Sequence, residues 1–218
     1  MRIAMKLYSE NSSPFSAPVR LAIYAKGLDA DIEPPPGGLL SAKFHTINPL
    51  GTIPCLMLEN GAPLPESVAI LEYLEDKFPR PPLRPETAEA RAHVRLLQRI
   101  GELQITTPLV ELARLDGHAI SDPTFSTWLT RLIRGLSSLQ IYLREDGLAT
   151  GPQLTLADCQ LAPALFLLPK IARQIGKPKL LAAYPPLLRY VGAVGAHPAV
   201  RRVLDEMAPA WGVRAAAA

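Results

Sequence analysis

The segment Thr52–Phe78, TIPCLMLENGAPLPESVAILEYLEDKF, changes its hydrophobic period partway along its length. It begins with two short apolar runs, TIPCLML and APLP, and the sequence ENG between them is typical of a β-hairpin turn. The remainder, ESVAILEYLEDKF, has the three- and four-residue spacing of an amphipathic helix. The segment therefore predicts a strand, a hairpin turn, a second strand and a helix, in that order.

The residues before this segment predict a strand, a helix and a further strand. IAMKLYS alternates as a strand does, PVRLAIYAKG has helical spacing and ends at a glycine, and DADIEPP suits a second short strand. A loop rich in glycine and proline follows. A βαβ unit followed by a ββα unit is the layout of a thioredoxin-like α/β domain.

The residues after the segment predict a different kind of domain. Phe78–Pro85, FPRPPLRP, is rich in proline, which cannot continue a helix and suits a stiff, exposed linker. Beyond it we expect helices and no second set of strands. The expected helical stretches are Glu86–Leu115, Asp122–Glu145, Thr155–Ile175 and Leu187–Met207. The sequence thus predicts a thioredoxin-like α/β domain over residues 1–79, a linker over 80–86, and an all-α helical-bundle domain over 87–218.

Composition and charge narrow the possible partners. The 218-residue chain is 48% hydrophobic, and its net charge of +3 comes from interleaved positive and negative residues. Because no basic stripe is present, we expect no nucleic-acid partner. The most apolar stretch, Leu161–Ile171, is far shorter than the roughly 20 residues that span a bilayer, so we expect no membrane segment. The N-terminus has no signal-peptide apolar region, which predicts a cytoplasmic protein.

Cysteine and histidine usage argues against a disulfide and against a metal site. Cys55 and Cys159 are the only cysteines. Because cytosolic chains rarely keep a disulfide, we expect two free, buried thiols. The four histidines lie far apart and lack the spacing of metal ligands, so no metal is expected.

Pro54 stands within a predicted strand, where its missing N–H prevents ladder pairing. In a thioredoxin-like layout, a proline at the start of the third strand is typically cis. A cis bond would leave the N–H and C=O of Ile53 facing outward, free to pair with an extended peptide. Hydrophobic periodicity alone does not separate this reading from an ordinary trans proline on an edge strand.

Glu66 and Ser67 stand at a strand-to-helix junction. The simpler interpretation is an N-cap, with the Ser67 hydroxyl bonded to amides of the first helical turn. The functional interpretation is that those amides and the helix dipole bind a ligand carboxylate. Further along, Thr155 and Asp158 fit a capping box, with Leu154 placed as a hydrophobic staple, and we expect Asp158 to act in folding.

Three serines, in the stretch NSSPFSAPVR, precede the first predicted helix. If Ser13 caps that helix, Pro14 suits its first position, but Pro18 then falls in the second turn. If Ser16 is the cap, Pro18 lies in the first turn, where proline is tolerated. A hydroxyl near a helix N-terminus could stabilise a bound thiolate. A serine-hydrolase nucleophile is not supported, because no G-x-S-x-G elbow is present.

The ordered motifs SPFSAPVR, NPLGTIPCL, LPESVAILEYLEDKFP and LTLADCQLAP resemble the soluble glutathione S-transferase superfamily across nearly the whole chain. The closing YPPLLRYVGAVGAHPAVRRVLDEM is similar to the last helices of that family. The resemblance is to bacterial, serine-type members with zeta-, tau- and omega-like features. It implies glutathione as co-substrate, a homodimer, a detoxifying role, and an electrophile pocket in the helical domain.

The resemblance also implies roles for particular residues. Ser13 would hydrogen-bond the glutathione sulfur and stabilise its thiolate, with Ser12 and Ser16 as alternatives. The residues implied in glutathione binding are Thr52, Ile53, Pro54, Glu66 and Ser67. Gln104, Thr107 and Glu111 are candidates for the electrophile pocket, but packing or surface positions fit them equally well.

The implied activity is conjugation of glutathione to a small hydrophobic electrophile. SPFS resembles the C-P-F-x of omega-type members with serine in place of cysteine, which argues against a mixed disulfide on the protein. TLADCQLAP is similar to the zeta type, which implies a glutathione-dependent cis–trans isomerase of maleylpyruvate or maleylacetoacetate as an alternative. A non-catalytic glutathione-fold binding protein is a further alternative.

Overall fold

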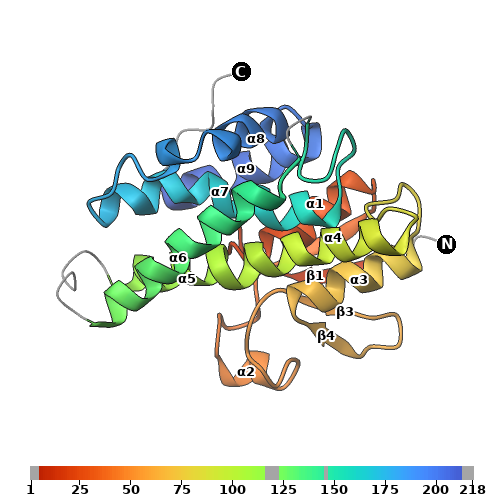
Figure 1. Cartoon of the computed structure of the whole chain (residues 1–218). Coiled ribbons are helices and arrows are strands. Elements are labelled where there is room, and N and C mark those ends of the chain that lie inside the picture. The colour runs from red at the N-terminus through yellow and green to blue at the C-terminus, as the bar shows by residue number, and fades with distance from the viewer. Residues whose placement is uncertain (1–4, 116–122, 145–146, 213–218) are drawn as a thin grey trace.

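The computed structural model describes residues 5–115, 123–144 and 147–212. A small mixed sheet with its own helices is followed by a larger group of helices (Figure 1). This arrangement confirms the predicted order of a thioredoxin-like α/β domain and an all-α domain. The exact division at residues 80–86 stays a prediction.

Four strands form the sheet in the order β2-β1-β3-β4. β1 (Met5–Tyr8) pairs in parallel with β2 (Ala30–Glu33) and antiparallel with β3 (Cys55–Met57), and β3 pairs antiparallel with β4 (Pro63–Pro65). The parallel pair of β1 and β2 requires a crossover, which α1 (Ala17–Ala25) supplies. The antiparallel pair of β3 and β4 closes through the ENG turn. The predicted βαβ and ββα units are therefore confirmed.

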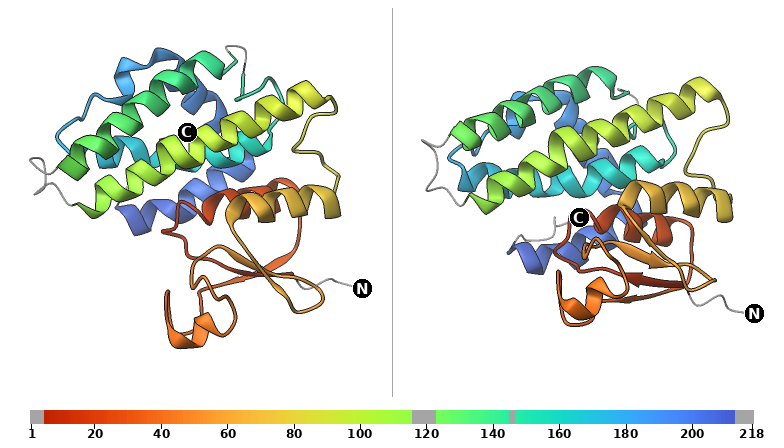
Figure 2. Two further views of the ribbon diagram at one scale, coloured as in Figure 1. Left: turned by 60° about the horizontal axis from the view of Figure 1, so that its bottom comes forward. Right: turned by 90° about the horizontal axis from the view of Figure 1, so that it is seen from below.

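The two faces of the sheet have different covers, because successive side chains on a strand point in opposite directions. Leu7 points to the main core beneath α1 and α3 (Ser67–Lys77), which lie between the sheet and the helical domain (Figure 2). Tyr8 points to the other face, where its ring meets Phe44 at 5.5 Å in an edge-to-face contact.

Phe44 belongs to α2 (Ala42–His45), a short helix that the sequence did not predict. It lies in the loop rich in glycine and proline. The Ser41 hydroxyl caps it by accepting the Phe44 N–H at 3.0 Å. The loop is thus fixed to the sheet at its middle.

The helical domain is confirmed as all-α in its described part, with some changes of detail. The stretch 86–115 contains α4 (Ala88–Arg99), a π-helical segment (Ile100–Thr106) and α5 (Thr107–Arg114). The next helix, α6, runs over Pro123–Tyr142, and the ends expected at Asp122 and Glu145 lie outside the described residues.

The stretch 187–207 divides into two helices, α8 (Pro185–Gly195) and α9 (Pro198–Trp211). The division falls at His197, whose ring nitrogen caps α9 by accepting the Ala199 N–H at 3.2 Å. Pro198 then occupies the first position of the new helix, where proline is tolerated. Just before α8, Leu181–Ala183 forms a single 3-10 turn.

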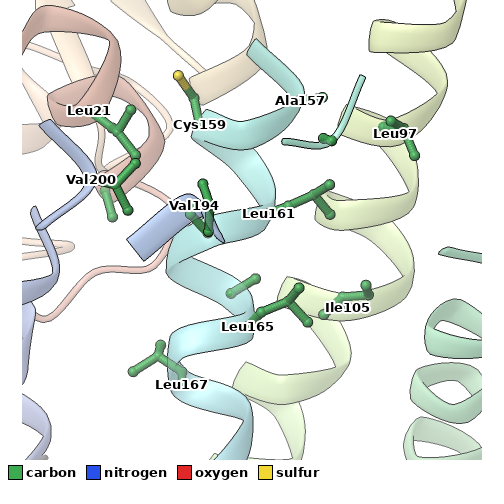
Figure 3. Packing of buried hydrophobic residues seen from close by; sticks show 14 of the residues in the cluster. Leu21, Leu97, Ile105, Ala157, Cys159, Leu161, Leu165, Leu167, Val194 and Val200 are labelled. Atoms are coloured by element: carbon green, nitrogen blue, oxygen red, sulfur yellow. The ribbon is translucent and has the colours of Figure 1, made fainter. Parts of the chain in front are cut away.

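The central helix is α7 (Leu156–Gln174), most of whose side chains are buried. Leu161 and Leu165 extend toward the helix that carries Leu97 and Ile105 (Figure 3). On its other sides α7 contacts α1, α8 and α9. It therefore joins the core of the helical domain to the helices of the sheet domain.

The start of α7 is fixed by Asp158, which is fully buried. Its carboxylate accepts the Thr155 N–H at 2.8 Å, as the predicted capping box requires, and it also accepts the Thr155 hydroxyl at 3.0 Å. It also accepts the Ala149 N–H at 2.8 Å and the Tyr190 hydroxyl at 3.1 Å. Burial raises the pKa of the Asp158 carboxyl, and these hydrogen bonds oppose that rise.

The segment between α3 and α4 is not fully exposed, so the prediction of an exposed linker is wrong in part. Leu83 is 3% exposed, and its N–H donates to the Glu75 carboxylate at 3.0 Å. The buried Lys26 ammonium pairs with Glu75 and donates to the carbonyls of Phe78 at 2.8 Å and Pro81 at 2.9 Å. These bonds satisfy both charges and attach the segment to α1.

Replacing Asp158 by alanine should lower the free energy of unfolding by roughly 3 kcal/mol, because a cap is lost and the buried Ala149 N–H loses its acceptor. Urea unfolding monitored by circular dichroism measures the change. Asp205→Ala, at an exposed position of α9, is the control and should remain within about 0.5 kcal/mol of the wild type. Equal effects of the two substitutions would contradict a structural role for Asp158.

Candidate active site

A cleft of about 660 Å³ lies between the sheet domain and the helical domain. Its sheet-side wall comes from the turn after β1, the loop before β3 and the start of α3. Seven of the eight residues that the sequence proposes for contact with the sulfur or for glutathione binding line it: Ser12, Ser13, Thr52, Ile53, Pro54, Glu66 and Ser67. The eighth, Ser16, does not. The structure therefore brings together residues that span more than fifty positions of sequence in one wall.

Ser13 lies in the turn between β1 and α1, at the edge of the cleft. Its hydroxyl oxygen accepts the Ser16 N–H at 3.1 Å. A serine hydroxyl has one proton to donate and two lone pairs to accept with. The Ser16 amide uses one lone pair of the Ser13 oxygen and does not use its proton. The Ser13 proton therefore remains available for an acceptor in the cleft.

Ser16 is the residue before α1, with Pro18 in the first turn, so the helix begins where the second of the two capping alternatives places it. Its hydroxyl makes no capping bond, however, and its oxygen is fully buried with no hydrogen-bond partner among the described residues. The turn 13–16 instead uses the Ser13 oxygen as acceptor. Ser16 is thus placed in the core and cannot reach a ligand in the cleft.

Pro54 follows a cis peptide bond, as the thioredoxin-like layout predicted. Ile53 is buried and packs with Tyr8 and Phe44 on the second face of the sheet. Within the described ranges, neither its N–H nor its C=O makes a backbone hydrogen bond. The N–H and C=O of this residue, beside the cleft, are therefore available to pair with an extended ligand.

Glu66 has a backbone φ of 72°, a conformation that residues other than glycine seldom adopt. It occupies the N-cap position of α3, and its side chain makes no capping bond. Ser67 is the first helical residue, so the prediction that its hydroxyl caps the helix is wrong. The first amides of α3 therefore have no side-chain cap, and they lie beside two cleft residues, where a carboxylate would meet their N–H groups.

The loop before β3 is held by Asn48, which is fully buried. Its side-chain amide donates to the Thr52 carbonyl at 2.8 Å, and its oxygen accepts the Leu50 N–H at 3.1 Å. This arrangement places Thr52 on the cleft. Leu39 and Leu40, both exposed, form an apolar rim on the same side.

The helical wall of the cleft differs from the one expected. Its residues on the π-helical segment and α5 are Glu102, Val110, Ala113 and Arg114. The candidates Gln104, Thr107 and Glu111 do not line the cleft, which favours the packing and surface positions that the sequence left open for them. The π-helical segment adds residues per turn, so it shifts the angular position of every later residue relative to a regular α-helix.

The three expected residues have other contacts. Gln104 accepts a hydrogen bond from Arg131 of α6 at 3.3 Å, and the Thr107 hydroxyl donates to the Glu102 carbonyl at 2.9 Å. Glu111 forms an ion pair with Arg114 at 2.8 Å. They serve helix packing and surface charge.

Two cleft residues come from the last third of the chain and were not found by sequence reasoning. Gln174 ends α7, and Trp211 ends α9. The Trp211 indole N–H donates to the Ser12 carbonyl at 2.7 Å. Only their amphipathic helices were visible in the sequence, and nothing local marks either residue as facing a ligand.

Neither cysteine is available as a reactive thiol. Cys55 and Cys159 are free and buried, as predicted. Burial raises the pKa of the Cys55 thiol to about 11, and burial likewise raises the pKa of the Cys159 thiol. Both remain protonated near neutral pH, so the protein itself offers no nucleophilic thiolate at the cleft.

The fold and the cleft together define a two-domain protein that can hold a ligand between a thioredoxin-like sheet and a helical bundle. Family models agree: that of the N-terminal domain of glutathione S-transferases matches residues 7–82, and that of the C-terminal domain matches residues 88–193. The chain belongs to the glutathione S-transferase family.

Individual relatives extend over nearly the whole chain. A maleylacetoacetate isomerase of Pseudomonas aeruginosa is 30% identical, covering 91% of this chain and 94% of its own. The structure of a maleylpyruvate isomerase, described as a bacterial glutathione S-transferase of the zeta class, is 26% identical, with a TM-score of 0.75 over 92% of this chain and 97% of its own. A glutathione S-transferase of Methylobacillus flagellatus, with glutathione bound, is 25% identical, with a TM-score of 0.78 over 92% and 98%.

The different positions of Ser13 and Ser16 can be tested by thiol labelling. In the folded wild type, Cys55 and Cys159 should react only slowly with a thiol reagent. Ser13→Cys should add a thiol that reacts at least roughly tenfold faster, because it opens to the cleft, whereas Ser16→Cys should react as slowly as the wild type. Similar labelling rates for the two variants would contradict the placement of the two serines.

Proposed function

We propose that this protein activates glutathione as a thiolate and adds it to a small hydrophobic electrophile. The observation that carries the proposal is the Ser13 hydroxyl, whose proton is free to donate into the cleft while its oxygen accepts the Ser16 N–H. Such an amide donor also strengthens the hydroxyl as a donor, because hydrogen bonds in a chain polarise one another.

The proposed role of Ser13 is to hydrogen-bond the glutathione sulfur in its charged form. A hydrogen bond that favours the thiolate lowers the pKa of a thiol that otherwise titrates near 8.5. More thiolate is then present at neutral pH. The sulfur of glutathione is the nucleophile, and the serine is not consumed.

The rest of the peptide would be held by groups on the same wall. The N–H and C=O of Ile53 would pair with the cysteinyl backbone of glutathione. The first amides of α3, with Ser67 and Glu66, would hold the γ-glutamyl end, since a carboxylate is stabilised at a helix N-terminus. The strained φ of Glu66 supports this role, because strain of this kind is concentrated at ligand sites.

The electrophile would occupy the space between Phe15, the Leu39–Leu40 rim and the helical wall. Val110 and Ala113 make that wall apolar. A new sulfur–carbon bond forms at the electrophilic carbon, and a leaving group such as halide departs with the bonding electrons. The thiol proton passes to solvent when the thiolate forms.

A second candidate is cis–trans isomerisation of maleylacetoacetate or maleylpyruvate. It is favoured by the names of the relatives and by Arg114, the one arginine or lysine among the described residues that line the cleft. The thiolate would add to the double bond, rotation would follow, and elimination would release glutathione unchanged. Both candidate reactions begin with the same thiolate.

The proposed homodimer and the cytoplasmic location follow from the family resemblance and remain predictions. None of the helices in the described part of the chain is long and apolar enough to cross a bilayer.

Ser13→Ala should reduce kcat/KM for glutathione conjugation of an aryl halide by roughly 10- to 100-fold, because a hydrogen bond to a charged group is lost. With glutathione saturating, the pH profile of kcat/KM for the aryl halide reports the pKa of the bound glutathione thiol. That pKa should rise toward the value of free glutathione, because the variant no longer stabilises the thiolate. Ser126→Ala, which removes an exposed hydroxyl on α6, is the control.

The same assay on Ser12→Ala tests the neighbouring serine of the turn, which also lines the cleft. If the rate and the pH profile change with Ser12→Ala and not with Ser13→Ala, the thiolate role belongs to Ser12. Equal rates for Ser13→Ala and the wild type remove Ser13 from the mechanism.

Arg114→Gln separates the two candidate reactions. A dicarboxylate needs a cation in the cleft, so this substitution should lower kcat/KM for isomerisation by about tenfold, while conjugation of a neutral aryl halide should change little. Arg134→Gln, at an exposed position on α6, is the matched control. Purified protein that leaves maleylacetoacetate and maleylpyruvate unchanged in the presence of glutathione would rule out the isomerase candidate.

A further inference from the structure

Helix α9, the last helix of the described residues, contacts the turn that carries Ser13 at two points. The turn itself belongs to the sheet domain and connects β1 to α1. One contact is made through Arg20 of α1, and the other is made directly by Trp211.

Arg20 is 0% exposed, and its guanidinium braces the first half of the turn. Nη1 donates to the Ser9 hydroxyl at 2.9 Å and to the Glu10 carbonyl at 2.6 Å, and Nη2 donates to the Asn11 carbonyl at 3.3 Å. Its Nε lies 3.2 Å from a carboxylate oxygen of Glu206 on α9. A buried arginine requires such a partner, so α9 supplies the charge that keeps Arg20 in this position.

Glu206 is itself held in place by its neighbours. Its second oxygen accepts the Tyr24 hydroxyl at 2.9 Å. Arg202, one turn earlier on α9, lies 3.6 Å from the centre of the Tyr24 ring. Helix α9 is thereby fixed against α1, and its final turn reaches the cleft.

Trp211 holds the next residue of the turn. Its indole N–H donates to the Ser12 carbonyl at 2.7 Å, and its ring forms part of the cleft wall. Its own carbonyl is contacted by the ammonium of Lys170 on α7. Gly212, with a φ of 57°, then ends the helix in a left-handed conformation.

The four residues before Ser13 are therefore each held by a side chain that α9 carries or stabilises. We propose that Trp211 is a positioning residue, which fixes the Ser12–Ser13 peptide so that the Ser13 hydroxyl points at the glutathione sulfur. This inference rests on the proposed function. It makes the thiolate geometry depend on the helical domain as well as on the sheet domain.

A positioning role differs from simple packing in what it affects. If Trp211 only fills space in the wall, a phenylalanine at that position keeps most of the contact area. If its N–H fixes the Ser12 carbonyl, phenylalanine removes the effect entirely. The Trp211→Phe variant separates these roles, because it keeps an aromatic ring and deletes the donor.

The experiment is a double-mutant cycle between Trp211→Phe and Ser13→Ala, measured as kcat/KM for aryl halide conjugation and as its pH profile. Trp128→Phe is the matched control, because Trp128 is the other tryptophan of the chain and lies on α6, away from the cleft lining. Urea unfolding of each variant checks that it is folded.

We expect Trp211→Phe to lower kcat/KM by roughly tenfold, since small misplacements of a reacting group are costly in rate. Its pH profile should shift in the same direction as that of Ser13→Ala. The double variant should be no slower than Ser13→Ala alone, because Trp211 acts through Ser13. Trp128→Phe should match the wild type.

Two results would overturn the inference while leaving the proposed function intact. One is a Trp211→Phe variant with the wild-type rate and pH profile beside a slow Ser13→Ala. The other is a double variant slowed by the product of the two single effects. A Ser13→Ala variant with the wild-type rate would instead remove the proposed function, and the inference with it.

If Trp211→Phe does not fold, Glu206→Gln tests the second contact. It keeps a hydrogen-bond acceptor for Tyr24 and removes the charge beside Arg20. The same cycle with Ser13→Ala should again show no further loss in the double variant. Wild-type kinetics in a folded Glu206→Gln variant would overturn the role of α9.

Discussion

The helical domain depends on the hydrogen bonds that the buried carboxylate of Asp158 accepts. It joins the start of α7 to the Thr155 cap, to the preceding loop at Ala149 and to Tyr190 of α8. Because α7 runs through the centre of the helical domain and also contacts α1, its start sets the position of helices in both halves of the molecule. A fully buried carboxylate is tolerated there because its oxygens accept four hydrogen bonds.

The cleft inherits its geometry from this packing. Its sheet-side wall offers the Ser13 hydroxyl, the N–H and C=O of Ile53 and the start of α3. The segments that carry these groups are held in place by Arg20, by Asn48 and by packing against the core. Its helical wall offers the apolar side chains of Val110 and Ala113 together with Glu102 and Arg114. In the proposed reaction, glutathione would bind the first wall and the electrophile would bind the second, so the two would meet where the packed domains face each other. The Arg20–Glu206 ion pair and the bonds Tyr24–Glu206 and Trp211–Ser12 are polar, specific attachments between the two halves.

Local sequence signals succeeded where the feature itself is local. The alternation in IAMKLYS, the ENG turn and the capping box of Thr155 and Asp158 each depend on neighbouring residues, and each is present in the structure. The signals failed where a distant part of the chain decides the outcome. Leu83 is buried because Glu75 and Lys26 hold its segment. Gln104, Thr107 and Glu111 do not line the cleft, and a π-helical segment, which no sequence pattern marked, changes the helical phase between α4 and α5.

The sequence by itself determined the order of elements, the two-domain division in outline, the free thiols and the group of polar residues at the ends of β1, β3 and β4. These follow from hydrophobic period, turn chemistry and residue type, which act over a few positions. Only the tertiary structure decided that Ser13 opens to the cleft while Ser16 is buried, and that Trp211 meets Ser12 across 199 positions. Those outcomes depend on where α1 begins and how α9 packs against it. The physical reason is that a side chain's direction is fixed by contacts between segments, which no local pattern contains.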